Sequence, residues 1–177
     1  MAATAALLTA QRELDRTLNR IDGSAVTRFT QALRASQGRV FFSGQGRSGL
    51  SAQMAAMRFM HLGRDAHFVG EATAPSVRDG DRLVIVSGSG KTPVSVGFAE
   101  IAKREKAQVL LVTHEHDSPL WKIADHAVHI PAVGSTQFGG TLFEQSALIL
   151  LDSIVADLMA DLPDPVGTMW HNHTNLQ

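Results

Sequence analysis

Hydrophobic runs and amphipathic stretches alternate along the chain beyond residue 38. The runs are short and rich in Val, Ile, Leu and Phe, and the stretches between them repeat apolar residues at helical spacing. Continuous apolar runs separated by helices are typical of a parallel sheet covered on both faces and joined by right-handed crossovers. The pattern predicts an α/β three-layer sandwich with five parallel strands, at 39–43, 66–70, 82–87, 108–113 and 126–131.

Helices are expected between these strands, and capping residues mark two of their starts. Thr92-Pro93 and Ser118-Pro119 each place an N-cap residue before a proline at the first helical position. The predicted helices cover 48–63, 93–106, 119–124 and 142–162, with a short segment after Pro165.

The first 37 residues are predicted to form a helical hairpin that breaks at Asp22-Gly23, with Ser24 as the N-cap of its second helix. Each helix has one apolar face. The faces consist of Leu7, Leu14, Leu18 and Ile21 in the first helix and of Val26, Phe29 and Leu33 in the second. We expect such faces to cover the sheet or to pack on another subunit.

The composition is that of one folded domain, predicted to span 1–177, with the hairpin at 1–37 and the α/β core, last helix and tail at 38–177. Net charge is -1 and no block of like charges appears, so nucleic-acid binding is not expected. The absence of cysteine excludes disulfides and thiolate metal sites, and favours the reducing cytoplasm.

No membrane segment is expected. Residues 1–18 lack the apolar core of a signal peptide. The most apolar stretch, 147–160, is too short to span a bilayer and contains Asp152 and Asp157.

Two loops rich in glycine and serine, 43–49 and 87–92, each follow a strand and precede a helix. Glycines let the backbone approach a ligand, while hydroxyls and helix-start N–H groups can hold phosphate oxygens. In a flavodoxin-like strand order, 2-1-3-4-5, both loops would meet where ligands bind such sheets. Together they predict a site for a small phosphorylated ligand.

Other interpretations of these loops are weaker. Residues 44–49 fit G-x-G-x-x-G, and Asp65 lies at a suitable distance to bind a ribose, so a dinucleotide fold is an alternative. A nucleotide P-loop ending at Gly90-Lys91-Thr92 is excluded, because Ile85 stands where that motif needs glycine.

The histidines suggest no clear metal site. The stretch His114-Glu115-His116-Asp117 leaves a strand for a loop without an evident separate ligand, so a solvated loop is favoured. His126 and His129 flank a strand and are expected at the surface or hydrogen-bonded in the core.

Glu144 follows a glycine pair at the start of the last long helix. Thr141 and Glu144 fit a T-x-x-E capping box, which alone could explain the glutamate. A carboxylate in a first helical turn is also placed for proton transfer, since the helix dipole favours its ionised form. Both roles can hold at once.

Together these motifs resemble the sugar isomerase (SIS) domain family and, within it, the 6-phospho-3-hexuloisomerases. The similarity spans nearly the whole chain. Its segments are 44–49 (GQGRSG), 57–63 (MRFMHLG), 68–76 (FVGEATAPS), 87–92 (SGSGKT), 140–145 (GTLFEQ) and 173–176 (HTNL).

The resemblance implies a homotetramer that converts 3-hexulose 6-phosphate reversibly to fructose 6-phosphate in the ribulose monophosphate pathway of formaldehyde fixation, with no metal or organic cofactor. It implies a base, Glu144, and two groups of substrate-binding residues. The phosphate would be held by Ser87, Gly88, Ser89, Gly90, Lys91 and Thr92, and the sugar would be contacted by Gly46, Arg47 and Ser48.

A second acid–base group is useful because fructose 6-phosphate is mostly a closed ring, and His61 or His173 could open it. His61 lies about 20 Å along its helix from Ser48, so it could act only across a subunit interface. We favour His61 as this catalytic group, acting in a neighbouring subunit, and place His173 among the substrate-binding residues. Two alternatives remain: a sugar-phosphate-sensing SIS module without turnover, and an isomerase of another sugar phosphate such as arabinose 5-phosphate.

Overall fold

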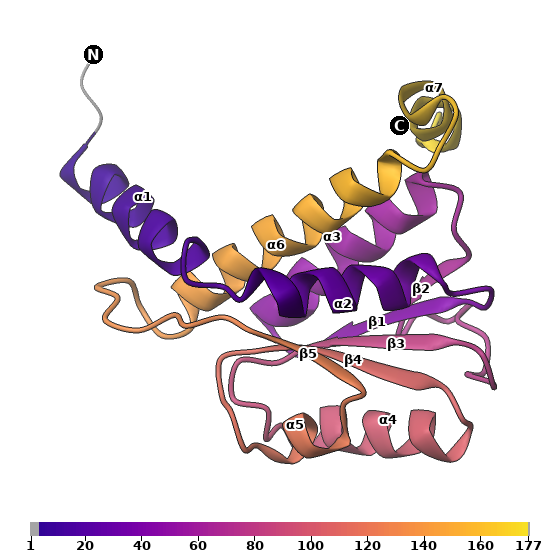
Figure 1. Ribbon diagram of the computed structural model, residues 1–177, viewed down its shortest axis with the longest axis horizontal. Coiled ribbons are helices and arrows are strands. Elements are labelled where there is room, and N and C mark those ends of the chain that lie inside the picture. The colour runs from indigo at the N-terminus through magenta and orange to yellow at the C-terminus, as the bar shows by residue number, and fades with distance from the viewer. Residues whose placement is uncertain (1–3, 177) are drawn as a thin grey trace.

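The computed structural model describes residues 4–176, and its centre is a five-stranded parallel sheet with the order β2-β1-β3-β4-β5 (Figure 1). The predicted strand order and sandwich are confirmed. Residues 1–3 and 177 of the predicted domain lie outside the described residues. The strands are β1 (Val40–Gly44), β2 (Ala66–Phe68), β3 (Arg82–Val86), β4 (Gln108–Thr113) and β5 (His126–His129).

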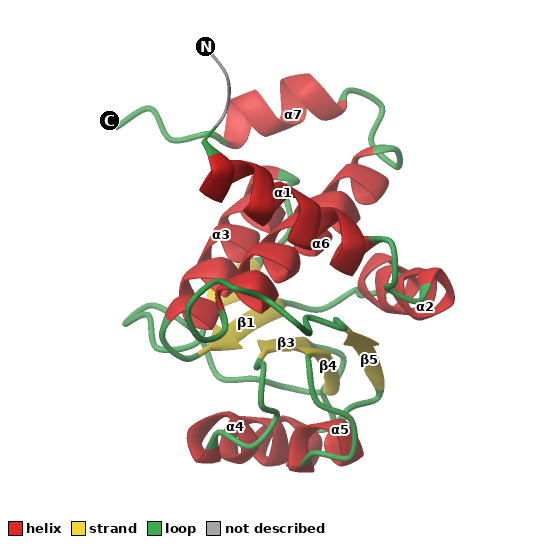
Figure 2. Ribbon diagram, turned by 90° about the vertical axis from the view of Figure 1, so that its left-hand side faces the viewer, coloured by secondary structure: helices red, strands yellow, loops and turns green. Residues whose placement is uncertain are grey.

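Helices cover both faces of the sheet (Figure 2). One face packs against α2 (Gly23–Arg34), α3 (Arg47–His61) and α6 (Thr141–Met159). The other packs against α4 (Pro93–Arg104) and α5 (Pro119–Ile123). Figure 1 shows the remaining two helices beyond opposite ends of α6: α1 (Ala5–Leu18) and α7 (Pro165–Asn172).

Two separate cores result from the alternation of side chains along the strands. Phe42, Val84 and Leu110 point toward the layer of α2, α3 and α6. Their neighbours Phe41 and Leu111 point toward α4 and α5. Because both faces are buried, the central strands β3 and β4 contain runs of consecutive apolar residues, as a doubly covered parallel sheet requires.

The two helices of the N-terminal hairpin differ in what they bury. In α2, Phe29 and Leu33 enter the core over the sheet, as predicted. In α1 the buried side chains are Glu13 and Thr17, while Leu7, on the predicted apolar face, is 60% exposed. The apolar face of α1 therefore does not cover the sheet.

The start of α2 corrects one prediction. Its N-cap is Asp22, whose carboxylate accepts a hydrogen bond from the backbone N–H of Ser24 at 2.9 Å. Ser24 lies inside the helix because the aspartate side chain reaches the N–H two residues ahead. Within residues 4–176, no helix combines the length and apolarity needed to cross a membrane.

Candidate active site at the carboxyl ends of the strands

The two glycine-serine loops leave the sheet side by side. β1 and β3 are neighbours, and their last paired residues are Gly44 and Val86. Each loop leads directly into a helix, α3 from the first and α4 from the second. Neither helix start has a side-chain cap, so backbone N–H groups at two positive helix ends are available to an anion.

Glycines allow the first loop to turn tightly. A Cβ on Gly44 would lie 2.8 Å from the nitrogen of Gly49, so only glycine lets the strand end pack on the helix start. Gly46 has φ of +57° at the N-cap of α3, a conformation that glycine adopts without strain. Arg47 follows as the first helical residue, with its side chain exposed.

The second loop is held by the segment that follows β4. The Gly88 carbonyl accepts hydrogen bonds from the His114 N–H at 3.1 Å and the Thr113 hydroxyl at 3.2 Å. Gly90 has φ of +61° and packs so closely that a Cβ there would lie 2.1 Å from the Ser118 hydroxyl. With the Gly88 carbonyl hydrogen-bonded and Gly90 buried, Ser89 and Lys91 remain exposed at the loop surface.

Glu144 does not take part in the predicted capping box. The N-cap of α6 is Gly140, and Thr141 is already helical, with its hydroxyl donating to the Phe138 carbonyl at 2.6 Å. The Glu144 carboxylate forms an ion pair with the guanidinium Nε of Arg47 instead. Since the helix begins one residue earlier than a capping box requires, Glu144 is free to face α3.

The ion pair joins the first loop to α6, and the second loop lies next to them. The Glu144 side chain is 15% exposed and that of Arg47 is 63% exposed. Phe143 lies directly below the second loop, because a Cβ on Gly88 would be 3.3 Å from its ring. The structure thus gathers Arg47, Glu144 and the two loops at one edge of the sheet.

His61 and His173 lie elsewhere. They stand at the far end of α3, with ring centroids 5.1 Å apart, and line a cavity of about 400 Å³ together with Arg58, Met159, Val166, Met169 and Trp170. Burial lowers the pKa of His61, and the charges of His173 and Arg58 lower it further. Sequence reasoning proposed both histidines but did not predict that they meet.

Three further histidines, His114, His116 and His129, form a stack beside β5. His116 lies between Trp121 and His129, with ring centroids 4.5 Å and 3.9 Å away. His129 Nε2 lies 2.8 Å from the His114 carbonyl, and burial lowers the pKa of His129. Over residues 4–176 there is no group of three or more His, Cys, Asp or Glu side chains arranged to hold a metal ion.

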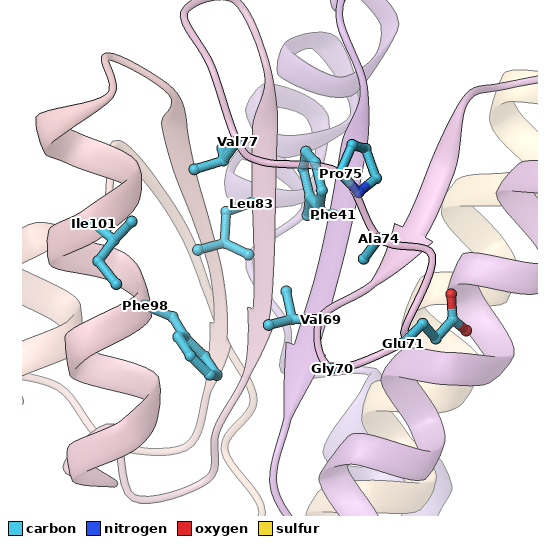
Figure 3. A pocket seen from close by; sticks show the side chains of 10 residues that line it. All are labelled: Phe41, Val69, Gly70, Glu71, Ala74, Pro75, Val77, Leu83, Phe98 and Ile101. Carbon is cyan, nitrogen blue, oxygen red and sulfur yellow. The ribbon is translucent and has the colours of Figure 1, made fainter.

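A cavity of about 240 Å³ lies on the α4 side of the sheet, under the loop that follows β2 (Figure 3). Its lining includes Phe41, Leu83 and Phe98, and its one charged residue, Glu71, points away from these apolar side chains. The lining offers no cation to a phosphate, so this cavity does not suit a sugar phosphate.

Comparison with known proteins identifies the family. The SIS domain model matches residues 33–159, and the chain therefore belongs to the SIS domain family, as its motifs predict. It is 40% identical over 148 residues to the 3-hexulose-6-phosphate isomerase of Mycobacterium gastri, covering 79% of this chain and 74% of that protein. The Bacillus subtilis 3-hexulose-6-phosphate isomerase is 36% identical over 151 residues, covering 80% of this chain and 82% of that protein.

A solved structure agrees over the whole fold. A Methanococcus jannaschii protein, whose crystal structure was used to infer a 3-hexulose-6-phosphate isomerase function, aligns with a TM-score of 0.82 at 29% identity. The alignment covers 98% of this chain and 100% of that one.

Two neighbours of the site escaped sequence reasoning. The Ser51 hydroxyl lies 3.4 Å from the backbone carbonyls of both Arg47 and Glu144, where it bridges α3 and α6. Its position one helical turn after Arg47 was the available signal. Phe143 was not predicted, because nothing in the sequence distinguishes an apolar helical residue that packs on a loop from one that packs in the core.

Proposed function

We propose that this protein is an isomerase that interconverts 3-hexulose 6-phosphate and fructose 6-phosphate through a cis-enediolate. The observation that supports this most is the Arg47–Glu144 ion pair beside two uncapped helix starts. The pair supplies a carboxylate and a cation, and the helix starts supply a place for phosphate. The relatives named 3-hexulose-6-phosphate isomerase support the choice of sugar.

The reaction needs few groups. Moving a carbonyl from C3 to C2 requires removal of the proton on C2, an enediolate, and protonation at C3. One carboxylate on one face of the enediolate, Glu144, makes both transfers. Arg47 then stabilises the negative oxygen that develops when the proton leaves.

The substrate is oriented by the two loops. Ser87, Ser89 and Thr92 hold the phosphate with the amides of Gly88 and Gly90, and Lys91 adds a positive charge at the surface. From the other loop, Gly46 and Ser48 contact the sugar. The site thereby fixes both ends of an open-chain sugar phosphate around the Arg47–Glu144 pair.

We place this reaction in the cytoplasm, as part of the ribulose monophosphate pathway that assimilates formaldehyde. A chain without cysteine needs no oxidising compartment to form disulfides. In that pathway this chain would rearrange the 3-hexulose 6-phosphate that a preceding enzyme forms.

We further propose that the protein works as a homotetramer and that His61 opens the sugar ring in a neighbouring subunit, with His173 beside it. His61 and Arg47 lie at opposite ends of α3, about 20 Å apart, so one chain cannot bring them together. The outer face of α3 carries exposed apolar side chains, as a subunit interface would. Its exposed residues are Leu50, Met54, Met57 and Met60.

The lowered pKa of His61 suits this role. A neutral imidazole can accept the proton of the anomeric hydroxyl as the ring opens. Burial, together with the charges of His173 and Arg58, lowers that pKa and would keep His61 neutral near pH 7.

The function is tested by incubating the purified protein with fructose 6-phosphate in deuterated water. Isomerisation to the 3-hexulose removes the proton on C3 and should place deuterium at C2. The return to fructose 6-phosphate should then place deuterium at C3. Exchange at C1 would indicate an aldose-forming isomerase instead. A protein that binds the sugar without exchange at either carbon would be a sensor, and the proposal would be wrong.

Replacing Ser89 and Thr92 together by Ala should lower kcat/KM by at least about tenfold, because hydrogen bonds to a charged group contribute about 1.5–3 kcal/mol each. The fold should survive, as checked by circular dichroism. Thr27→Ala, which removes an exposed hydroxyl from α2, is the control and should behave as wild type. Unchanged kinetics in the double variant would rule out this loop as the phosphate site.

Glu144→Gln should lower turnover by about 10²–10⁴, since an amide cannot accept the C2 proton. Stability should fall by only about 0.3–1 kcal/mol, the contribution of a charge near a helix start. Because Glu144 does not cap α6, Glu144→Ala should be about as stable as the Gln variant. The matched control is Glu100→Gln on the exposed side of α4, and near wild-type isomerisation by Glu144→Gln would exclude it as the base.

Assembly and the histidine are tested together. Light scattering should give a mass well above the 19.0 kDa of one chain. Met57→Glu should weaken the assembly and lower activity, whereas Lys122→Glu on α5 should not. Mixing inactive His61→Ala and Glu144→Gln variants under conditions of subunit exchange should restore partial activity, because some sites then contain both native residues. A fully active monomer would contradict both proposals.

A further inference from the structure

One buried carboxylate plays no part in the proposed chemistry. Glu13 of α1 is 6% exposed, and among the residues that the structure describes its side chain accepts hydrogen bonds only from the loop that leads from β5 into α6. Its Oε1 accepts from the Thr136 N–H at 2.8 Å and the Thr136 hydroxyl at 2.9 Å. Its Oε2 accepts from the Ser135 hydroxyl at 2.7 Å and the Gln137 side-chain amide at 3.0 Å.

A second residue of the same helix holds the same loop. Arg16, three positions after Glu13, donates to the backbone carbonyls of Val133 at 3.2 Å and Gly134 at 3.1 Å. Residues three apart on a helix share a face, so α1 presents an acceptor and a donor to successive residues of one loop. The side chains of α1 therefore bind both backbone carbonyls and hydrogen-bond donors of this loop.

The charge of Glu13 is stable under working conditions. The hydrogen bond from the Thr136 backbone, followed by those from Ser135 and Gln137, lowers the pKa of Glu13 to about 2. The carboxylate is therefore ionised at neutral pH, and hydrogen bonds to an ionised acceptor are stronger than neutral ones.

The held loop leads directly to the candidate active site. Residues 138–140 connect it to α6, and the Thr141 hydroxyl ties the helix start back to Phe138 at 2.6 Å. Glu144 follows in the first turn and faces Arg47. A shift of the loop would thus shift the start of α6 and the carboxylate that it presents.

We propose that Glu13 is a positioning residue for the isomerisation: by fixing residues 135–137 it sets the start of α6 and the place of the Glu144 carboxylate. This rests on the proposed function. Glu13 touches neither substrate nor reacting atoms in this proposal. It acts through the loop, and it makes α1 part of the catalytic apparatus although α1 does not cover the sheet.

The test uses Glu13→Gln in the full chain. Glutamine keeps the volume but turns one acceptor oxygen into a donor, so two of the four loop donors lose their partner. We expect kcat to fall by about tenfold or more, since a misplacement of about 1 Å can cost a hundredfold in rate. KM should change little, because the phosphate loop lies on other elements. Asp15→Asn, an exposed acid on the same helix, is the control and should match wild type.

A purely structural role gives a different result. It predicts a lower melting temperature with unchanged kcat per folded molecule, and that result would overturn the proposal. Hydrogen exchange supplies a readout that needs no substrate: the Thr136 amide should lose protection in Glu13→Gln, while amides in the β-strands keep it. Retained protection would also count against the proposal.

The loop side offers a second variant if Glu13→Gln does not fold. Ser135→Ala with Thr136→Val leaves α1 intact and removes two of the donors, and it should lower kcat in the same way. Where Glu13→Gln folds, adding these changes should cost little further, because residues that act through one contact are not additive. Full additivity would show that Glu13 acts elsewhere.

Failure of the positioning role can be distinguished from failure of the proposed isomerase function. Absence of deuterium exchange in the wild-type protein would reject the isomerase proposal by itself. A wild-type protein that exchanges at C3, together with a Glu13→Gln variant of equal kcat, would reject only the positioning role.

Discussion

The parallel pairing of β1 with β3 is the constraint on which the rest of the structure depends. It ends both strands at one place, with Gly44 beside Val86, so α3 and α4 begin next to each other. Neither helix start is capped by a side chain, and the two positive helix ends face a common space. One more strand between them would move the loops about 5 Å further apart and divide the site.

The position of Glu144 follows from how α6 begins. Because Gly140 is the N-cap of α6, the Glu144 side chain is not part of a capping box. It forms an ion pair with Arg47 of α3 instead. The carboxylate is mostly buried and the guanidinium is mostly exposed, so the arginine is the partner that can turn toward a substrate oxygen. Because the guanidinium is open to solvent, water or a substrate oxygen can replace the carboxylate as its partner. The resting ion pair and the proposed catalytic pair are therefore compatible.

The length of α3 separates two sets of polar groups within one chain. Arg47 opens the helix at the sheet edge, and His61 ends it in a cavity shared with Trp170. Several apolar side chains between them, Met57 among them, are exposed. At the other end of the layer, Glu13 connects α1 to the loop that starts α6. The helical layer thus links the candidate site to surfaces that a second copy could cover.

The sequence by itself determined the α/β class, the strand positions and the two loops, because apolar periodicity and glycine-rich turns are local signals. It also indicated the apolar face of α1, but not that Glu13 and Thr17 would be the buried residues of that helix. Contacts between polar residues far apart in the chain produce no periodic pattern in the sequence. The Arg47–Glu144 pair spans 97 positions and the Glu13–Ser135 contact spans 122, so only the tertiary structure, which decides where helix ends and loops meet, could bring them together.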